Sequence, residues 1–238
     1  MTIACTVTEG LGALTVTVTG RLGLDDVASL RLRLMKCLAE QPDMVIVDLN
    51  GMRVENPLSL AVFMAVGRQA ARWPGIPLLL CTDVPETRAQ LTTAAYHRLP
   101  LFRTVESARQ HAETYERSLP AVSEEIFPIQ GAVRHARNVA TDACLRWGLP
   151  DLVGPASLIA NELVANVVVH ASTIATFRLS LRRRYLTIAV RDGSSEPPAT
   201  PSEDDRPGRG LLLVEAMAAS WGWLPSEGGK VVWATLAR

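Results

Sequence analysis

Residues 161–170, Asn-Glu-Leu-Val-Ala-Asn-Val-Val-Val-His, constrain this chain most, because they place polar side chains at four-residue intervals within an apolar segment. On an α-helix with 3.6 residues per turn, Glu162, Asn166 and His170 share one face. Burying such a polar stripe costs free energy unless each group has a partner, and a nucleotide with its magnesium ion offers suitable partners. Alternatively, the three side chains line the solvent side of an amphipathic helix.

Two later segments favour the nucleotide site over the solvated helix. Residues 190–195 are predicted to be a β-strand that ends in an Asp192-Gly193 turn. Residues 206–214 are predicted to be a glycine-rich loop that opens a helix, where exposed backbone amides can hold phosphate oxygens. Three such segments in this order indicate a nucleotide site more specifically than one segment does.

The three segments resemble the GHKL, or Bergerat, ATP-binding fold, and in particular the anti-sigma-factor serine kinases of bacterial partner-switching systems. The shared pattern is an E-L-x-x-N-x-x-x-H-A box, a strand that ends near Asp-x-Gly, and G-R-G-L-x-L-V at residues 208–214. The resemblance covers roughly residues 121–238. It implies an α/β sandwich that binds ATP and Mg²⁺.

The residue types agree with that chemistry. Asn166 offers an amide oxygen to a magnesium ion that bridges the phosphates, and Glu162 can orient or deprotonate an attacking hydroxyl. Asp192 can accept a hydrogen bond from the exocyclic amine of adenine, which would select ATP over GTP, and Gly193 lets the backbone approach the ring. The remaining predicted nucleotide contacts are Gly208, Arg209, Gly210 and Leu211, and the Ser-, Pro- and acid-rich segment 194–205 is predicted to be a lid.

Two sites depart from the family pattern, and a third residue is not expected to take part in catalysis. Residues 194–198 lack the second glycine that usually follows the Asp-containing turn. Lys230 stands where a threonine supports adenine recognition in wider GHKL proteins, so we assign it no base-reading role. His170 is expected to close the helix rather than to catalyse.

The first 117 residues alternate predicted strands and helices, which suggests a sheet with helices packed against it. This half resembles a STAS domain, the fold of the antagonists that anti-sigma-factor kinases phosphorylate. The resemblance rests on Val-Ile-Val-Asp-Leu-Asn-Gly at residues 45–51, followed by a helix. The overall prediction is therefore an α/β chain with a STAS-like sheet-and-helix domain over 1–117, a linker over 118–125 and a histidine-kinase-like ATPase sandwich over 126–238.

The resemblance also locates a degenerate phosphoacceptor region. Phosphorylatable STAS domains carry a serine or threonine at the start of a helix, whereas the aligned residues here are Asn56, Pro57, Leu58 and Ser59. Leu58 occupies the acceptor position and has no hydroxyl group. Ser59, one residue further, is the alternative acceptor, although a one-residue shift turns a helical side chain by about 100°. We therefore interpret this domain as a docking or regulatory module.

Composition excludes several other classes of function. The formal net charge is zero, with 24 basic and 24 acidic residues, so no broad electrostatic attraction to nucleic acid or an anionic membrane is expected. The basic run 182–184 is most simply a hairpin turn. The four cysteines show no metal-ligand spacing and are expected to be buried. No leader and no stretch able to span a bilayer is expected, which predicts a cytoplasmic protein.

Two functional hypotheses follow. The first is an ATP-dependent serine/threonine protein kinase that phosphorylates a STAS-type anti-sigma-factor antagonist and/or sequesters a sigma factor, with Arg134 and Arg137 as candidate partner contacts and a homodimer as a plausible state. The second is a nucleotide-gated binding protein with little or no phosphotransfer, whose STAS domain docks on a kinase or sigma partner. A metabolic enzyme is disfavoured because no nucleophile with a matched base stands elsewhere in the sequence.

Overall fold

In a computed structural model the chain forms two compact units, Met1–Arg117 and Ser118–Arg238. The structure describes residues 3–10, 13–73, 75–93, 96, 99–116, 120–182, 184–198 and 209–238, with the backbone alone for residues 72, 112–116 and 209.

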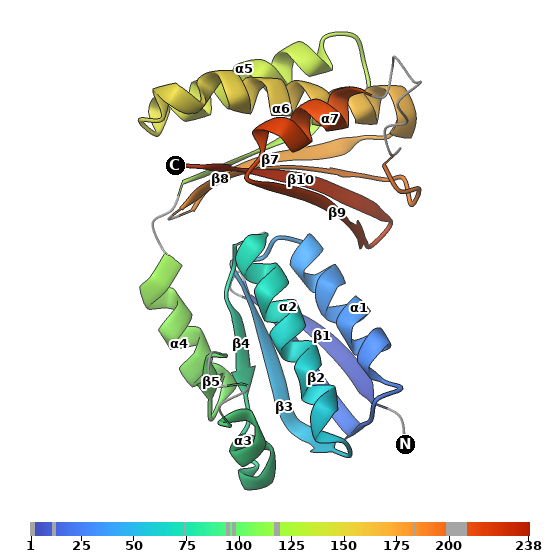
Figure 1. Ribbon diagram of the computed structural model, residues 1–238, viewed down its shortest axis with the longest axis vertical. Helices are drawn as coiled ribbons and strands as arrows, with labels where there is room; N and C mark the ends of the chain where they lie inside the picture. Colours follow the sequence, from blue (N-terminus) through green and yellow to red (C-terminus); the bar gives the residue numbers. More distant parts are fainter. Residues whose placement is uncertain are drawn as a thin grey trace. The chain divides into compact units, whose positions relative to one another are not determined.

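Strand β3 lies at the centre of the N-terminal sheet, whose strand order is β1-β2-β3-β4-β5. The β1–β2 pair is antiparallel and the other three pairs are parallel. Val45, Ile46 and Val47 are fully buried, as expected for a parallel strand that is covered on both faces. Helices α1 and α2 pack side by side, and α4 contributes Ala108 to a separate cluster with Ile46 (Figure 1). The elements are β1 (Ala4–Gly10), β2 (Ala13–Leu22), α1 (Val27–Ala39), β3 (Met44–Val54), η1 (Pro57–Leu60), α2 (Ala61–Arg72), β4 (Leu78–Cys81), α3 (Pro85–Leu91), β5 (Leu101–Phe102) and α4 (Val105–Glu116).

The C-terminal unit is a two-layer sandwich of an antiparallel sheet and three helices (Figure 1). Its strand order is β6-β7-β8-β10-β9, so the last strand along the chain lies inside the sheet. Alternate residues of β10, including Val232 and Ala234, join the core beneath α5, α6 and α7. The elements are β6 (Ala121–Ile126), α5 (Ala132–Arg146), η2 (Pro150–Leu152), α6 (Val153–Asn166), η3 (Val167–Ala171), β7 (Ala175–Leu181), β8 (Tyr185–Asp192), α7 (Arg209–Met217), β9 (Ser220–Ser226) and β10 (Gly229–Ala237).

The predicted fold class is confirmed in both halves, but one boundary is wrong. The predicted linker over residues 118–125 overlaps β6, which pairs with β7 in antiparallel register from Ala121 to Ile126. An edge strand of six residues that includes two glutamates carries little apolar signal, so its period of two is hard to see in the sequence. The C-terminal unit therefore begins before residue 126.

The helical run Pro150–Ala171 corrects the expectation that no stretch could span a membrane. Among the described residues this run is long and apolar enough to do so by length and composition, with a mean hydropathy of 1.6. Here it is the central helix of a packed core, in which Ile159 and Leu163 are almost completely buried. A helix that is apolar on most sides is expected in such a position.

Candidate functional site

Helix α6 carries the polar stripe that the sequence analysis singled out. Its apolar face, which includes Ile159 and Leu163, is buried in the core with residues of β8 and β10. Small residues, Ala156 and Ala160, are fully buried in the same core, where α6 packs against α5. Glu162 is only half-buried on the flank of the helix. The sheet and α5 thus fix the helix, and its polar flank is left for a ligand.

The helix widens immediately after Asn166. Residues Val167–Ala171 form a π-helical turn, in which the Ser172 amide donates to the Val167 carbonyl at 2.8 Å, and Ser172 adopts a left-handed φ of 51°. The prediction of one continuous α-helical face therefore holds for Glu162 and Asn166 but fails for His170. The wider turn displaces His170, which is exposed although it still borders the same cavity as Asn166. Single π-turns of this kind occur frequently at functional sites.

A cavity of about 110 Å³ lies between α6, the π-turn and the ends of β8 and β10. Its apolar walls come from Leu163, Val167, Val190 and Val232, and its polar groups include those of Asn166, Asp192 and Lys230. A buried water needs roughly 10–15 Å³ of such space, so the cavity can hold a larger group. Apolar walls with a few convergent polar groups are typical of small-molecule sites.

The side-chain amide nitrogen of Asn166 is buried without a hydrogen-bond partner among the described residues. Such a group costs about 1–3 kcal/mol when it is left unpaired. Because Asn166 also lines the cavity, a ligand there would supply the missing partner. The unpaired amide therefore indicates that the cavity accommodates a bound molecule with a hydrogen-bond acceptor.

Asp192 and Lys230 form a buried ion pair in the lining of the cavity. The Lys230 ammonium lies 3.0 Å from Oδ1 of Asp192, and their side chains are 8% and 3% exposed. The same Oδ1 accepts from the Ser194 amide at 2.8 Å, and Lys230 also donates to the Ser194 carbonyl at 3.4 Å. The two residues are direct neighbours across strands β8 and β10. Asp192 is one of the predicted site residues, whereas its pairing with Lys230 is not predicted from the sequence.

The turn after Asp192 is fixed by two contacts that the sequence analysis missed. The Gly193 amide donates to Oγ1 of Thr173 at 2.9 Å, which ties the turn to the end of the π-helix. A Cβ atom on Gly229 would collide with the carbonyl group of Asp192. Glycine at 229 lets β10 approach β8 closely here. The signals were present in the sequence as a threonine and a glycine, but both residue types are common in ordinary loops.

Glu162 lies against the start of α7. Its carboxylate would collide with a Cβ atom on Gly210, and its Oε1 accepts from the Asn161 side chain at 2.9 Å. The glycine therefore allows α7 to approach α6 at this point. The structure brings Glu162 next to the glycine-rich segment and places Asn166 one helical turn further along, at the cavity.

Comparison with protein families decides the identity of this unit. Residues 129–236 match the family model described as the histidine kinase-like ATPase domain. The C-terminal unit carries a histidine kinase-like ATPase domain. No curated protein matches the sequence of the whole chain significantly.

Solved structures that are similar to the N-terminal half include anti-sigma factor antagonists. One, from Mycobacterium paratuberculosis, is 18% identical, covers 47% of this chain and 95% of its own, and has a TM-score of 0.40. Unphosphorylated SpoIIAA is 13% identical, with 48% and 100% of the two chains covered and a TM-score of 0.40. The phosphorylated form of SpoIIAA, from Bacillus, is 13% identical, with 45% and 98% covered and a TM-score of 0.37.

The remaining predicted nucleotide contacts of the ATPase domain are only partly described. Gly208 lies outside the described residues, as does most of the predicted lid, and Arg209 is described by its backbone alone at the start of α7. The side chain of Leu211 is 5% exposed and belongs to the core. Leu211 could therefore touch a nucleotide through its backbone only.

The described part of the site fits a magnesium nucleotide. The cavity is apolar-walled, as a base requires, and the unpaired Asn166 amide lies at its edge. The described residues contain no cluster of three or more His, Cys, Asp and Glu side chains that could hold a metal by themselves. Magnesium bound through one protein oxygen together with substrate phosphates agrees with this arrangement.

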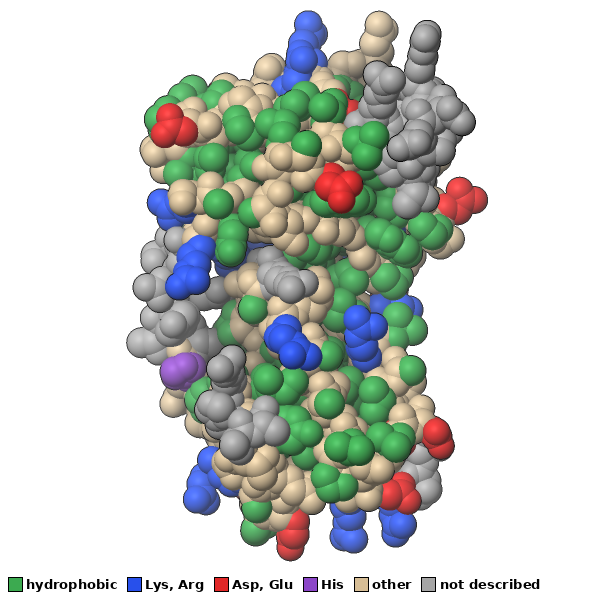
Figure 2. Space-filling model, viewed as in Figure 1, with side chains coloured by type: hydrophobic (Ala, Val, Ile, Leu, Met, Phe, Trp, Pro, Cys, Tyr) green, Lys and Arg blue, Asp and Glu red, His purple; other side chains and the backbone are tan. Residues whose placement is uncertain are grey.

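The two candidate partner contacts stand on the open side of α5. Arg134 and Arg137 are both exposed, and neighbouring His135 lies 3.8 Å from Glu124 of β6. On the face shown in Figure 2, basic and acidic side chains stand mostly singly among apolar and neutral ones.

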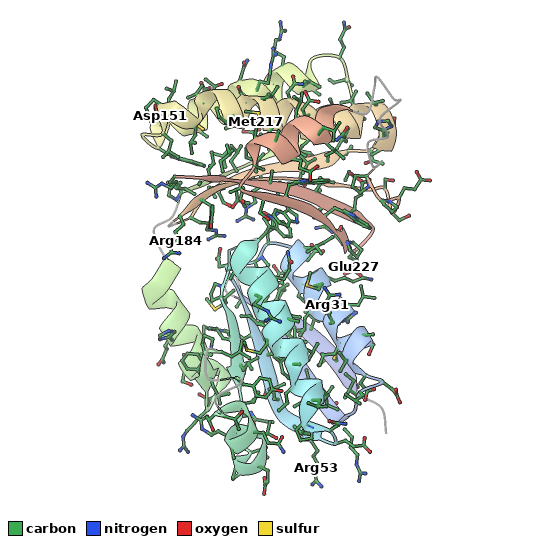
Figure 3. All side chains as sticks on the ribbon, in the orientation of Figure 1. Arg31, Arg53, Asp151, Arg184, Met217 and Glu227 are labelled. Carbon is green, nitrogen blue, oxygen red and sulfur yellow. The ribbon has the colours of Figure 1, made fainter. Side chains whose placement is uncertain are left out.

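The predicted hairpin is confirmed, because the Arg182 amide donates to the Tyr185 carbonyl between β7 and β8. Figure 3 shows Glu227 at the β9–β10 turn, where its carbonyl accepts from the Arg191 guanidinium at 2.9 Å.

The degenerate acceptor turn of the N-terminal unit is satisfied within itself. The Asn56 side chain accepts from the Leu58 amide at 3.0 Å and caps the helical turn that follows. Ser59 is 0% exposed, and its hydroxyl donates to the carbonyls of Asn56 and Leu22 at 2.6 and 3.3 Å. Leu58 is instead 71% exposed. The turn therefore presents an apolar side chain outward and keeps its only hydroxyl inside.

The cysteines behave as small apolar residues. Cys37, Cys81 and Cys144 are buried, and Cys5 is partly exposed. Burial raises the pKa of Cys37 and Cys144 to about 11 and that of Cys81 to about 12, with nearby Asp48 adding to the rise at Cys81. Such thiols stay protonated at neutral pH and are poor nucleophiles.

Proposed function

We propose that this protein is a partner-switching regulator whose ATPase domain binds Mg-ATP and transfers its γ-phosphoryl group to a serine or threonine of a STAS-type anti-sigma-factor antagonist. The ATPase domain and the STAS-like half support the assignment as a partner-switching regulator. The kinase reaction and the partner are the part that experiment has to test.

One observation carries the kinase proposal: a carboxylate is retained beside the glycine-rich segment. Glu162 lies against Gly210 at the start of α7, one helical turn from Asn166. Backbone amides at a helix start stabilise phosphate groups. A domain that only bound nucleotide would need Asn166 and Asp192 but not a carboxylate in this position.

Glu162 would act as the general base. The acceptor hydroxyl oxygen forms a bond to the γ-phosphorus while the bond from that phosphorus to the bridging oxygen breaks. Glu162 takes the hydroxyl proton, and ADP leaves with the bridging oxygen. The Asn161 amide, 2.9 Å from Oε1, orients the carboxylate before it accepts the proton.

Asn166 would hold the magnesium ion through its side-chain oxygen. The ion would neutralise charge on the phosphates when it is bound. The apolar walls around Leu163 and Val232 would exclude water from the base, and Asp192 would accept hydrogen bonds from the edge of the base.

The test is a transfer assay with labelled ATP, magnesium and a panel of intact STAS antagonists. We expect label on at least one antagonist with the wild type. Glu162→Gln should lower the transfer rate by roughly 10²–10⁴-fold and leave Mg-ATP affinity nearly unchanged, because general-base catalysis contributes about that much. Glu215→Gln, at an exposed position on α7, is the matched control and should transfer normally. Wild-type protein that binds ATP but labels no antagonist would contradict the kinase proposal.

A second function is favoured by the acceptor turn. Leu58 is exposed where an acceptor would stand, and Ser59 is fully buried, so this STAS-like unit offers no hydroxyl there. Such a unit could occupy a kinase or sigma-factor surface permanently while nucleotide binding gates the complex. Under that function Glu162→Gln leaves partner binding and its ATP dependence unchanged, and no transfer is seen.

We further propose that a sigma factor and a second copy of this chain are partners. The proposed site of action is the cytoplasm. Arg134 and Arg137 are exposed on one helix and could contact an acidic partner surface. Charge reversal at either position should weaken a sigma-factor complex, which pull-down with purified sigma factors would measure. A solution mass of one chain would exclude the homodimer.

A further inference from the structure

The buried lysine in the base pocket is not explained by ATP binding alone. Lys230 pairs with Asp192, the carboxylate expected to read the adenine amine, and both side chains line the cavity. A buried ammonium is costly unless it is paired and hydrogen-bonded. Its location beside the base-reading carboxylate therefore changes which base edges the pocket can accept.

The hydrogen-bonding capacity of the pair is only partly used. Oδ1 of Asp192 accepts from Lys230 and from the Ser194 amide, whereas Oδ2 has no hydrogen-bond partner among the described residues. The Lys230 ammonium donates to Asp192 and, at 3.4 Å, to the Ser194 carbonyl, and an ammonium group carries a third N–H. The pair therefore keeps one unused acceptor and one unused donor, and both residues line the cavity.

These two groups match the Watson–Crick edges of both purines. Adenine has an amino donor at position 6 beside an acceptor at N1, which suits Asp192 and Lys230 in that order. Guanine has a carbonyl acceptor at position 6 beside an N1–H donor, which suits Lys230 and Asp192. An aspartate alone would face the guanine carbonyl with a second acceptor, and the cation removes that repulsion.

We propose that Lys230 makes this pocket accept guanine as well as adenine, so that the ATPase domain takes purine nucleoside triphosphates as a class. This inference rests on the proposed nucleotide-binding function. It also revises the expectation that Asp192 selects ATP over GTP and that Lys230 has no part in reading the base. An aspartate alone offers only acceptors to the base, whereas the Asp192–Lys230 pair offers both a donor and an acceptor.

Calorimetric titration of Mg-ATP, Mg-GTP and Mg-ITP into the full-length wild type tests the proposal. We expect the Kd values for GTP and ITP to lie within about tenfold of that for ATP, since a mismatched polar edge would cost roughly 100-fold or more. ITP carries only the carbonyl and the N1–H, so it isolates the two proposed contacts without any substitution. Mg-CTP is the control for binding through phosphates alone and should bind more weakly than all three purines.

Lys230→Met removes the donor while keeping an unbranched side chain in the same space. We expect the ratio of GTP to ATP dissociation constants to rise by about tenfold or more, because a lost charge-assisted hydrogen bond costs on that order. Lys230→Arg should keep the ratio within about threefold of the wild type, since it retains a cationic donor. A thermal unfolding curve for each variant shows that it is folded.

Each outcome decides between distinct statements. GTP or ITP binding more than tenfold weaker than ATP binding in the wild type overturns the inference and leaves the ATP-binding proposal intact. If the purine nucleotides bind equally well and Lys230→Met leaves the ratio of GTP to ATP dissociation constants unchanged, Lys230 has no role in base recognition. If that variant does not fold, the comparison of ATP, GTP and ITP binding to the wild type decides whether the pocket accepts guanine. No binding of any nucleotide would instead refute the proposed function itself.

Discussion

The predicted acceptor turn of the N-terminal unit and the proposed nucleotide site of the C-terminal unit use their polar groups in opposite ways. At the turn, the Asn56 side chain and the Ser59 hydroxyl are satisfied by neighbouring backbone atoms, and an apolar residue, Leu58, points outward. At the nucleotide site, the Asn166 amide is buried and unpaired, and Asp192 has a free oxygen among the described residues. Unused hydrogen-bonding capacity therefore distinguishes a binding site from a turn that is complete in itself.

The largest expected effect comes from giving the turn an exposed hydroxyl. Leu58→Ser places that hydroxyl at the start of a helix, where backbone amides stabilise a phosphate group. If the kinase proposal holds, we expect this variant to incorporate label from ATP, whereas the wild type does not. Intact mass spectrometry would detect the added phosphate.

Two controls make this change specific to the turn. Leu58→Ala should take up no label, and Leu24→Ser, at another leucine that is 54% exposed, should also take up none. Equal labelling of the Leu24→Ser variant would show that any exposed serine is phosphorylated and that the turn has no special role.

Replacing the unpaired amide should separate binding from stability. Asn166→Ala should weaken Mg-ATP binding by at least roughly 10- to 150-fold, because it removes the proposed magnesium ligand, and the lost hydrogen bond from the amide to a charged group alone costs about 1.5–3 kcal/mol. The melting temperature should stay the same or rise, since the substitution removes a buried group without a partner. Calorimetry and thermal unfolding measure the two quantities.

Asn138→Ala, on the exposed side of α5, is the matched control and should change neither quantity. A large loss of stability in Asn166→Ala would mean that the Asn166 amide has a structural partner, and the comparison between the two regions would then lose its basis.

The close approach of α6 and α7 can be tested with two glycines. Gly210→Ala should forgo most or all of the roughly 0.5–1 kcal/mol that such a change contributes in an open helix, because the Glu162 carboxylate must swing away from the new methyl group. Gly154→Ala lies in α6, where a Cβ atom meets nothing within 4 Å, and should stabilise the domain by about 0.5–1 kcal/mol. Urea denaturation gives both free energies of unfolding, and equal effects would argue against the contact.

The smallest effect concerns the thiols. At pH 8, an alkylating reagent should modify Cys5 first, because it is partly exposed and its pKa is raised less than those of the buried thiols. Unfolding restores the ordinary pKa of about 8.5, so the buried thiols should contribute stability below that pH, and the contribution is lost as the pH rises towards their folded values of about 11 to 12. Peptide mapping after timed alkylation checks the order, and rapid labelling of Cys81 would contradict it.

Both folds could be predicted from the sequence, because a strongly apolar helix with a polar stripe and alternating strands leave clear periodic patterns. The sequence predicts a linker where strand β6 lies, because this edge strand has weak alternation of apolar and polar residues. The π-turn after Asn166 could not be foreseen, since its residues, Val-Val-Val-His-Ala, fit a continuous α-helix equally well. The partner of Lys230 lies 38 residues away, and only the strand register brings the two together.

The position of β10 inside the C-terminal sheet has a consequence for how this half folds. Residues 229–237 lie between β8 and β9, so the sheet has a gap until they are in place. Until then, the apolar side of α6 lacks Val232, Ala234 and Leu236, and a helix apolar enough to resemble a membrane span stays partly uncovered. Folding of this half must therefore wait for a contact between distant parts of the chain, a slow step that exposes the intermediate to aggregation.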